Sequence, residues 1–454
     1  MHADLASCIA AHASRGPRYT SYPPATEFGP LSVDRITREV AAIRTSSLPI
    51  SLYAHIPFCR SLCAYCGCNV IPTRDASRAD AYLDYLVTEL ALVARGEMTA
   101  PVVEIALGGG SPNFLSPTQL QTLVTAMDRL FTVHPDARRS IELDPRSTTA
   151  AQTETLGALR FTSISLGVQD FAAPVQDAIR RHQTVPQTKW LVDRARDVGM
   201  TDINIDMVYG LPLQTESSFA ATVDAVIELA PDRVALFGYA HLPDKLPHQR
   251  IVERAGRVLD AYERATLLVR AIARFEAAGY VHIGLDHFAR ADSTLAAAAR
   301  QHRITRTFQG YVERRADTIL GVGVSAISST PQAYWQNHGD LAHWQADIAA
   351  TRLPVARGYA LDADDCARRE VISRLMCDGE VDLSALGETH GIDAEMYFAR
   401  ELRDLGELDG LASWDGDLHR IETSSLGKLL VRNVCMVFDR YLRDRGPARF
   451  SPTI

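Results

Sequence analysis

The feature that most constrains the fold of this chain is a repeated alternation of short apolar runs with longer amphipathic segments. The apolar runs are rich in β-branched or aromatic residues and are bounded by Gly, Pro or Asp, which is typical of buried parallel strands. They cover residues 50–56, 102–109, 140–144, 163–169, 202–210, 233–240 and 280–288. A strand–helix unit repeated in this way predicts an α/β fold with a parallel sheet, as a complete or a partial barrel.

Helix signals lie between the apolar runs. Ser116 precedes Pro117, which predicts an N-cap followed by proline at the first helical position. Residues 80–96, 188–199 and 262–279 carry apolar faces with a 3.6-residue period, and each of these segments ends at Gly. Ligands of such folds bind at the carboxyl ends of the strands, where a cysteine-rich loop and a glycine cluster fall in this sequence.

The organisation changes near residue 360. At 454 residues the chain is too long for one ordinary domain. After the change the pattern is mostly helical, with one turn-rich segment at 412–424 that predicts a two-stranded hairpin. We therefore expect an N-terminal arm, a partial barrel with an extension, and a helical C-terminal domain, at residues 1–48, 49–358 and 359–454.

Charge and cysteine usage indicate the environment. The formal net charge of −8 argues against general attraction to nucleic acid or to anionic membranes. The N-terminus lacks a secretory pattern, and no segment approaches the roughly 20 apolar residues that a membrane span needs. We expect a cytoplasmic protein that binds neither nucleic acid nor membrane. Thiols stay reduced in that compartment, so clustered cysteines favour a metal or catalytic site over disulfides.

Four of the eight cysteines stand within one short arc, at Cys59, Cys63, Cys66 and Cys68. The first three have the spacing C-x3-C-x2-C. Three thiolates on one loop can ligate three irons of a four-iron cluster and leave the fourth iron open to a substrate or cofactor. The competing interpretation is tetrahedral zinc, with Cys68 or His55 as fourth ligand, although structural zinc sites usually combine two separated cysteine pairs.

Glycines and polar residues mark the ends of the next strands. Gly108–Gly110 ends the second predicted strand, where glycine lets the backbone approach a ligand closely; a tight strand-to-helix turn is the alternative. Glu142 and Asp206 are flanked by apolar strand residues, which favours a role in the site. For Asp144 and Asp170 we favour helix capping in the following loops.

The cysteine spacing, placed directly after the first strand, resembles the radical S-adenosylmethionine (SAM) superfamily. This resemblance implies a partial barrel of the radical SAM type and a 4Fe-4S cluster whose open iron is chelated by the amino and carboxylate groups of SAM. Reduction of the cluster then gives methionine and a 5'-deoxyadenosyl radical. The glycine cluster is similar to the strand end that holds the amino group of SAM, and Glu142 and Asp206 suit hydrogen bonds to ribose or adenine.

Several stretches resemble one branch of that superfamily, the oxygen-independent coproporphyrinogen III oxidases, also called coproporphyrinogen dehydrogenases. They include "GPRYTSYP", "YAHIPFCRSLCAYCGCN", "NIDMVYGLP", "LGVGVSAIS" and "VRNVCMVFDRYLR". The resemblance runs from Gly16 to the C-terminus. It implies conversion of the ring A and B propionates of coproporphyrinogen III to vinyl groups, giving protoporphyrinogen IX for haem synthesis without oxygen. The first step would be removal of a hydrogen from the propionate β-carbon.

The resemblance also implies site residues. Cluster ligands would be Cys59, Cys63 and Cys66. Contacts to the SAM on the cluster would come from Tyr53, Gly109, Glu142 and Ile327. A second SAM molecule would contact Tyr65, Gly110, Ser111, Gln169, Arg181, Asp206 and Ala240. The family commonly has Phe at position 65 and Thr-Pro-Thr at Ser111-Pro112-Asn113, so these departures affect details of the second site.

The implied substrate carries four carboxylates, which an acidic protein must meet with local positive charge. Arg18 in the N-terminal arm is the first candidate, with Arg250 and Arg290 behind it. Surface arginines in contact with solvent are the alternative for each. The family's habits imply a flavodoxin- or ferredoxin-type electron donor, an electron acceptor that the sequence does not name, and a monomer.

Three other interpretations remain open at this point. A haem chaperone would share the loop and barrel, but such relatives typically carry an aromatic residue in place of Cys68 and lack "GPRYTSYP". A radical methyltransferase or haem-opening enzyme would also consume SAM. A zinc-stabilised interaction protein is the alternative without catalysis. In the oxidase interpretation Cys68 is not a cluster ligand.

Overall fold

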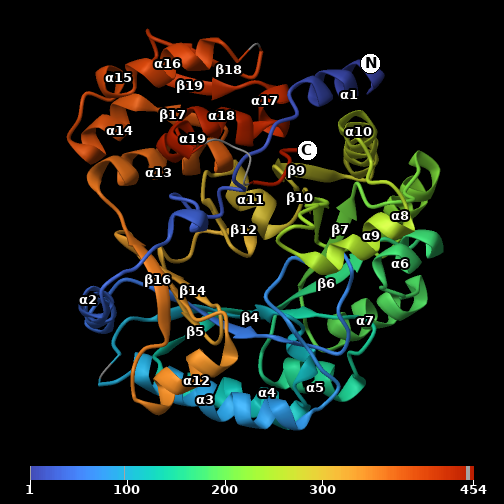
Figure 1. Ribbon diagram of the computed structural model, residues 1–454, viewed down its shortest axis with the longest axis vertical. Helices are drawn as coiled ribbons and strands as arrows, with labels where there is room; N and C mark the ends of the chain where they lie inside the picture. Colours follow the sequence, from blue (N-terminus) through green and yellow to red (C-terminus); the bar gives the residue numbers. More distant parts are fainter. Residues whose placement is uncertain (1, 97, 409, 446–449) are drawn as a thin grey trace. The chain divides into compact units, whose positions relative to one another are not determined.

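The computed structural model describes residues 2–96, 98–408, 410–445 and 450–454 (Figure 1). The chain forms two compact units, each assembled from separate stretches of sequence. The cysteine-loop unit comprises residues 28–206 and 315–360, and the terminal unit comprises residues 1–27, 207–314 and 361–454. This division by compactness differs from the predicted domains, whose limits at 48/49 and 358/359 remain predictions.

The cysteine-loop unit is built on one sheet. Its strands are β1 (Ile50–Ile56), β4 (Val102–Gly109), β5 (Val133–Leu143), β6 (Ser163–Gln169), β7 (Asp202–Tyr209), β13 (Thr318–Val322), β14 (Ile327–Ser329), β15 (Ala333–Asn337) and β16 (Val355–Ala360). Their order is β16-β15-β14-β13-β1-β4-β5-β6, followed by β7, which ends in the terminal unit. Neighbours from β13 to β6 pair in parallel, whereas β13 to β16 pair antiparallel.

Helices of this unit cover the sheet and begin at the signals seen in the sequence. They are α2 (Val33–Arg44), α3 (Ser77–Val93), η2 (Pro112–Phe114), α4 (Pro117–Leu130), α5 (Ala150–Ala158), α6 (Ala173–Ile179), α7 (Val185–Asp197) and α12 (Leu341–Ala349). Figure 1 shows α12, α3, α4 and α5 as neighbours along the sheet. Ser116 caps α4 as predicted, because its hydroxyl accepts from Gln119 N at 3.2 Å while the Gln119 side chain accepts from Ser116 N.

The terminal unit combines β-strands with most of the C-terminal helices. Its strands are β8 (Arg233–Gly238), β9 (Tyr280–Gly284), β10 (His287–Arg290), β11 (Ile304–Thr307), β12 (Gly310–Glu313), β17 (Glu380–Asp382), β18 (Ala412–Asp415) and β19 (Arg420–Thr423). From β7 the order continues β8-β10-β9, with β10 antiparallel to both neighbours. Smaller sheets are β11-β12 and β17-β19-β18.

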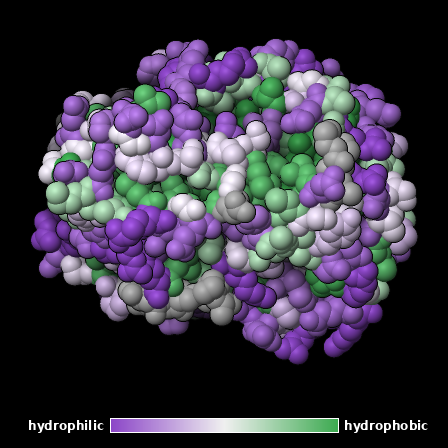
Figure 2. Space-filling view, turned by 90° about the horizontal axis from the view of Figure 1, so that it is seen from above, coloured by the Kyte–Doolittle hydropathy of each residue, from purple (hydrophilic) through white to green (hydrophobic). Residues whose placement is uncertain are grey.

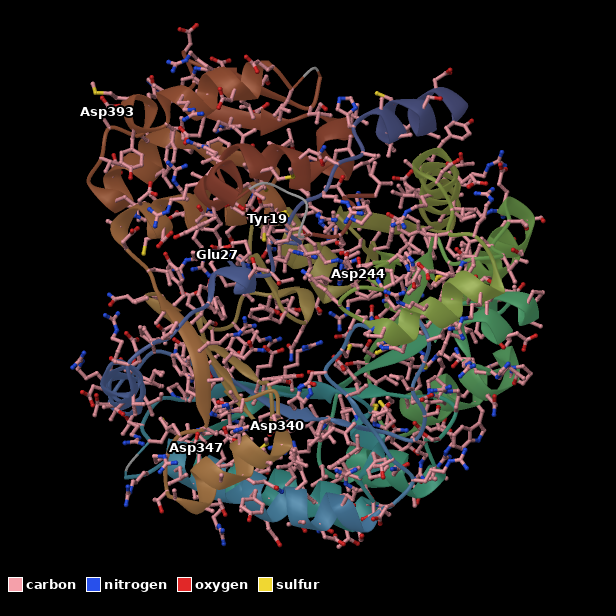
Figure 3. All side chains as sticks on the ribbon, viewed as in Figure 1. Tyr19, Glu27, Asp244, Asp340, Asp347 and Asp393 are labelled. Atoms are coloured by element: carbon pink, nitrogen blue, oxygen red, sulfur yellow. The ribbon has the colours of Figure 1, made fainter. Side chains whose placement is uncertain are left out.

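Helices of the terminal unit enclose a second apolar core. They are α1 (His2–Ala11), η1 (Ala25–Glu27), α8 (Glu216–Glu228), η3 (Pro247–Gln249), α9 (Arg250–Ala255), α10 (Ala261–Ala277), α11 (Thr294–Arg300), α13 (Ala363–Cys377), α14 (Leu383–His390), α15 (Ala394–Tyr397), α16 (Ala399–Gly406), α17 (Ser425–Leu429), α18 (Val431–Val437) and α19 (Arg440–Arg445). The N-terminal segment joins this core: Tyr19, labelled in Figure 3, is buried and donates to Asp439 Oδ2 at 3.0 Å.

The predicted fold class is confirmed: the chain has an α/β fold with a mostly parallel central sheet and a helical C-terminal region. The strands expected at 50–56, 102–109 and 163–169 match β1, β4 and β6. The single strand expected at 280–288 is wrong, because Leu285 takes a φ of 41° and the chain turns back to form the antiparallel pair β9-β10. The hairpin expected at 412–424 is confirmed as β18-β19.

One face of the molecule is mainly polar. On the face shown in Figure 2, hydrophilic residues cover most of the surface and hydrophobic residues form smaller groups. Within the part of the chain that the structure describes, no helix combines the length and apolar character needed to cross a membrane.

Candidate active site around the cysteine loop

The cysteine loop is closed at its base. It follows β1 directly, and the short strands β2 (Phe58–Cys59) and β3 (Ile71–Pro72) pair in parallel where it begins and ends. Ile71 N donates to Pro57 O at 2.7 Å, and Thr73 N donates to Cys59 O at 2.8 Å. Because both ends are tied to β1, all four cysteines of the loop lie at the carboxyl end of this strand.

The three thiols of the C-x3-C-x2-C spacing lie close together and beside positive charge. Cys63 is buried, and Cys59 and Cys66 are partly buried. Two guanidinium groups donate to Cys63 Sγ, from Arg181 Nη1 at 3.5 Å and Arg146 Nη2 at 3.6 Å. Burial, with smaller contributions from Cys66 and Cys63, raises the pKa of Cys59 to about 11 against the effect of a hydrogen bond with Ser111.

This environment fits a cluster ligand set. Thiols must be deprotonated to bind metal, and buried thiolates need neighbouring positive charge, which irons and guanidinium groups supply. No group of three or more His, Cys, Asp or Glu side chains surrounds a single-ion position among the described residues. A cubane cluster does not need such a position, because its ligands bind separate irons.

Cys68 differs from the other three thiols. A hydrogen bond with Cys66 raises the pKa of Cys68 well above its usual value, and burial adds to this effect. Its side chain nevertheless remains solvent-accessible. A raised pKa does not separate Cys68 from the proposed ligands, because the pKa of Cys59 is raised as well, and the absence of Cys68 from the ligand set stays a prediction.

The glycine cluster brings β4 against the cysteine loop. Gly109 has a φ of 113°, which favours glycine, and its N–H donates to Glu142 Oε2 at 3.0 Å. A Cβ on Gly110 would lie 2.8 Å from the carbonyl oxygens of Pro57 and Phe58. The glycines therefore let the end of β4 lie close against the cysteine loop, and their approach to a ligand stays a prediction.

Two carboxylates, Glu142 and Asp206, lie on β5 and β7, the strands that flank β6. Asp206 accepts from Asn204 Nδ2 at 2.7 Å and from Ser165 Oγ at 3.0 Å. Burial among protein atoms and the charge of Asp206 together raise the pKa of Glu142 to about 7, against a hydrogen bond from Gly109 N. The Glu142 side chain is nevertheless solvent-accessible, so its carboxyl group can meet a ligand.

Tyr53 and Ile327 lie on β1 and β14, the two strands that flank β13. Tyr53 on β1 pairs with Gly321 on β13, and a Cβ on Gly321 would lie 2.5 Å from Ile327 O. The Tyr53 hydroxyl lies 3.2 Å from His55 Nδ1, and His55 Nε2 lies 3.1 Å from Asn69 O. Burial lowers the pKa of His55 to about 4, so the ring is neutral and positions the end of the loop.

Gln169 and Arg181 lie together at the end of β6. A Cβ on Gly167 would lie 3.0 Å from both Gln169 Nε2 and Arg181 Nη2. Gln169 has a φ of 71°, a strained backbone conformation of the kind that clusters at functional sites. Burial raises the pKa of Tyr65 well above its usual value while the charge of Arg181 opposes the shift, which places this ring near the same guanidinium.

The capping role favoured for Asp144 is wrong. Thr149 caps α5, and Asp144 instead pairs with Arg146 at 2.6 Å and with Arg181 at 3.3 Å. Burial opposes ionisation, but the charge of Arg181 and the hydrogen bonds from Arg146 hold the pKa of Asp144 below its usual value. Asp144 therefore links the two guanidinium groups at Cys63. The capping role favoured for Asp170 is wrong as well: the N-cap of α6 is Ala172, the helix has no side-chain cap, and Asp170 accepts from Ala172 N at 2.7 Å in the turn before it.

Sequence reasoning missed the part that Asn113 plays. Its side chain is buried, donates to Thr148 Oγ1 at 2.9 Å and to Asp144 O at 3.1 Å, and accepts from Asp144 N at 3.1 Å. Asn113 therefore supports the turn that carries Asp144. The family commonly has Thr at position 113, so the departure from Thr-Pro-Thr changes the contacts that support this turn. The amide of Asn113, which can both donate and accept hydrogen bonds, is the feature of the sequence that could have indicated this role.

The remaining candidates lie in the terminal unit. The Ala240 carbonyl accepts from Gln249 Nε2 at 3.1 Å, and Arg18 Nη2 donates to Gly238 O at 3.0 Å. Arg250 pairs with the exposed Asp244, labelled in Figure 3, at 3.2 Å, and Arg290 pairs with Asp292 at 2.9 Å. Both of these arginines are largely exposed, which favours the surface interpretation for them.

Comparisons with known proteins agree with this arrangement. A sequence model described as the Radical SAM superfamily matches residues 53–226. An oxygen-independent coproporphyrinogen III oxidase of Pseudomonas aeruginosa is 41% identical over 451 residues, which cover 97% of this chain and 96% of that protein. The protein of that name from Escherichia coli K12 is 40% identical over 435 residues, 95% of this chain and 94% of its own.

A solved structure gives the same answer. Coproporphyrinogen III oxidase (HemN) from Escherichia coli, a radical SAM enzyme, matches with a TM-score of 0.90 and 40% identity, covering 94% of this chain and 98% of that one. The chain belongs to the oxygen-independent coproporphyrinogen III oxidase family. It is thus a radical SAM oxidoreductase, a class that uses a 4Fe-4S cluster and SAM. The predicted family is confirmed over the haem-chaperone alternative.

Proposed function

We propose that this protein converts coproporphyrinogen III to protoporphyrinogen IX without oxygen, by oxidative decarboxylation of the ring A and B propionates. The observation that carries the proposal is the closed cysteine loop with its C-x3-C-x2-C thiols, beside the glycine end of β4. This arrangement occurs in a chain that is 41% identical to an oxidase of that name over 97% of its length. The reaction serves haem biosynthesis.

Cys59, Cys63 and Cys66 hold the 4Fe-4S cluster in this proposal, and Cys68 does not. The cluster and SAM supply a carbon radical, which can take hydrogen from an unactivated C–H bond that no side-chain base can deprotonate. The chain contributes the surroundings. Arg146 and Arg181 stabilise the negative charge of the thiolate at Cys63, to which they donate at 3.6 and 3.5 Å.

The first SAM molecule binds between the glycine end of β4 and its neighbouring strands. Its contacts are Tyr53, Gly109, Glu142 and Ile327. The ionised Glu142 carboxylate is the natural acceptor for ribose hydroxyl groups, because Gly109 N occupies only Oε2. Gly109 and Gly110 carry no side chains of their own, so in this proposal the backbone at the end of β4 comes close to the methionine end of the cofactor.

A second SAM molecule is part of the proposal. Its contacts are Tyr65, Gly110, Ser111, Gln169, Arg181, Asp206 and Ala240. The support is that six of these seven residues lie in the cysteine-loop unit. Within that group, Ser111 Oγ lies 3.5 Å from Cys59 Sγ, and Gln169 and Arg181 share Gly167 as a neighbour.

The partners belong to the proposal as well. We infer a flavodoxin- or ferredoxin-type donor for the electron that reduces the cluster, a separate acceptor for the electron left after decarboxylation, and a monomeric cytoplasmic enzyme. Arg18 is the first candidate to meet a substrate carboxylate.

The test is an anaerobic assay of the cluster-reconstituted full chain with coproporphyrinogen III, SAM, a reductant and an electron acceptor. We expect protoporphyrinogen IX and methionine from the wild type and from Cys68→Ser, and neither from Cys63→Ser. Cleavage of SAM without any vinyl product would reject the substrate. Product formation by Cys63→Ser would reject the cluster assignment.

A further inference from the structure

The terminal unit contains a buried group of four arginines, which we call the arginine cluster: Arg18, Arg264, Arg306 and Arg432. Arg264 and Arg432 are 5% and 3% exposed, and the Arg306 side chain is 3% exposed. Only the Arg18 side chain, at 33%, has substantial access to solvent. Buried arginines normally have a carboxylate partner, because an unpaired buried charge is costly.

One carboxylate serves the arginine cluster. Asp286 lies 3.3 Å from Arg306 Nη1 and 3.8 Å from Arg18 Nη1, and it also accepts from His287 Nδ1 at 2.7 Å. Ion pairs between described residues give Arg264 and Arg432 no carboxylate. The group therefore carries more positive than negative charge.

Arg432 has a structural use for its donors. It binds the backbone carbonyls of Gly16, Pro17 and Pro452, the last two at 2.9 Å, and so holds the N-terminal arm that carries Arg18. Arg306 Nε donates to Arg18 O at 3.2 Å, which fixes the same arm. These two arginines position Arg18.

Arg18 and Arg264 approach the same glycine at the carboxyl end of β8. Arg18 Nη2 donates to Gly238 O at 3.0 Å, and a Cβ on Gly238 would lie 3.1 Å from Arg264 Nη2. Arg264 Nη1 donates to Tyr239 O at 2.9 Å, whereas its buried Nε has no hydrogen-bond partner. A Cβ on Gly210 would lie 3.3 Å from that Nε atom, so the backbone of two glycines packs against the Arg264 guanidinium, and the centre of the Tyr209 ring lies 5.8 Å from it.

The excess of positive charge lowers pKa values within the arginine cluster. Burial, together with the charges of Arg18 and Arg306, lowers the pKa of Arg432 to about 9. Burial also lowers the pKa of Arg264, and Arg18 adds to the effect while Tyr209 opposes it. An anion bound beside Arg18 and Arg264 relieves this repulsion.

We propose that Arg18 and Arg264 form a carboxylate-binding site at Gly238, and that its ligand is one propionate of the tetracarboxylate substrate. Two guanidinium groups match the planar, two-oxygen geometry of a carboxylate. The unpartnered Arg264 Nε gives the anion a buried donor, and the exposed Arg18 gives it an entrance. The choice of a propionate rests on the proposed function; the carboxylate of SAM is the other source of the same chemistry.

The test measures binding to the cluster-loaded full chain by fluorescence titration. The probes are coproporphyrin III, the stable oxidised form of the substrate, its uncharged tetramethyl ester, and SAM. Variants are Arg264→Gln, which removes the charge, and Arg264→Lys, which keeps the charge and loses Nε. The matched control is Arg274→Gln, on the same helix α10, where the exposed Arg274 pairs with Asp224 at 2.7 Å.

We expect Arg264→Gln to weaken coproporphyrin III binding by between about tenfold and a hundredfold, the usual range for a lost hydrogen bond to a charged group. Arg264→Lys should lose less, and Arg274→Gln should match the wild type. Binding of the ester should be the same in all four proteins. Equal coproporphyrin III affinity in Arg264→Gln and the wild type overturns the site. Weakened SAM binding with unchanged coproporphyrin III binding overturns the choice of a propionate.

Gly238→Ala keeps the inference testable if Arg264→Gln fails to fold. Its Cβ would lie 3.0 Å from Tyr209 Oη and 3.1 Å from Arg264 Nη2, so it displaces the guanidinium without removing a charge. We expect weaker coproporphyrin III binding with a normal thermal melt, and unchanged binding contradicts the site. These titrations involve no turnover. A wild type that binds the probe through Arg264 but forms no product would reject the proposed function alone.

Discussion

The cysteine loop and the arginine cluster both hold more guanidinium groups than carboxylates, but they differ in where the missing negative charge comes from. Beside the loop, Arg146 and Arg181 share Asp144 and also donate to Cys63. In the arginine cluster, Arg18 and Arg306 share Asp286, and Arg264 has no carboxylate.

At the cysteine loop the chain itself supplies the negative charge that balances the guanidinium groups. In the arginine cluster a ligand has to supply it. Thiolates of the loop can balance Arg146 and Arg181 once they bind a cluster. Asp439, another carboxylate of the terminal unit, is already used by the Tyr19 hydroxyl and by the backbone N–H of Tyr441. A bound anion is therefore the source of balance at Arg264.

The largest expected effect is at the loop. Cys59→Ser, Cys63→Ser or Cys66→Ser should abolish the cluster, because three thiolates are the minimum set for three irons. Iron and sulfide analysis after anaerobic reconstitution measures this directly. Cys68→Ser is the matched control and should retain the cluster; its loss would show that the fourth thiol is a ligand and that the assignment is wrong.

Removing the shared carboxylate, Asp144, should leave buried guanidinium groups beside the loop without a carboxylate partner, as in the arginine cluster. Asp144→Asn leaves Arg146 and Arg181 without a carboxylate, and we expect a loss of about 3 kcal/mol in the free energy of unfolding. Urea denaturation of the metal-free protein measures it. Asp193→Asn breaks an exposed pair with Lys189 and should cost less than about 1 kcal/mol. Equal losses in the two variants would remove the special role of Asp144.

Glu142 should make SAM binding depend on pH. Its pKa is raised to about 7, so the carboxyl group is mostly protonated at pH 6 and mostly ionised at pH 8. Since the carboxylate is the better hydrogen-bond acceptor for hydroxyl groups, affinity for SAM should rise several-fold over this range. Calorimetric titration of the wild type and of Glu142→Gln compares the two, and the variant should show a flatter profile. The same pH dependence of SAM affinity in both proteins would show that a group other than Glu142 causes it.

The smallest expected effect concerns the exposed arginines. Arg250→Gln and Arg290→Gln should change the KM for coproporphyrinogen III by less than about twofold, because these side chains form surface pairs with Asp244 and Asp292. Steady-state kinetics under anaerobic conditions measures this. An increase of KM by about tenfold or more in Arg250→Gln or Arg290→Gln would show that a surface arginine, rather than Arg264, binds the substrate carboxylate.

The sequence predicts the features that depend on local pattern. Apolar period and bounding glycines locate β1, β4 and β6, and Ser116 with Pro117 locates the start of α4. The cysteine spacing and Gly109 predict the loop and its neighbour because both follow strand ends.

Features that depend on distant pairing are not predictable in this way. The sequence around Asp144 predicts a helix cap, because its ion pair with Arg181 depends on a contact between distant residues. The turn at Leu285 requires a positive φ that its side chain does not signal. The arginine cluster joins residues from four distant stretches, and no spacing in the sequence relates Arg264 to Arg18.

The most direct test of this account is one paired measurement on Cys63→Ser and Arg264→Gln, each prepared anaerobically with the wild type. Iron content and affinity for coproporphyrin III are determined for the same samples. The account predicts opposite losses: Cys63→Ser loses the cluster and still binds the porphyrin, whereas Arg264→Gln keeps the cluster and binds the porphyrin weakly. Loss of both properties in one variant, with its fold intact, would contradict the separation of the two sites.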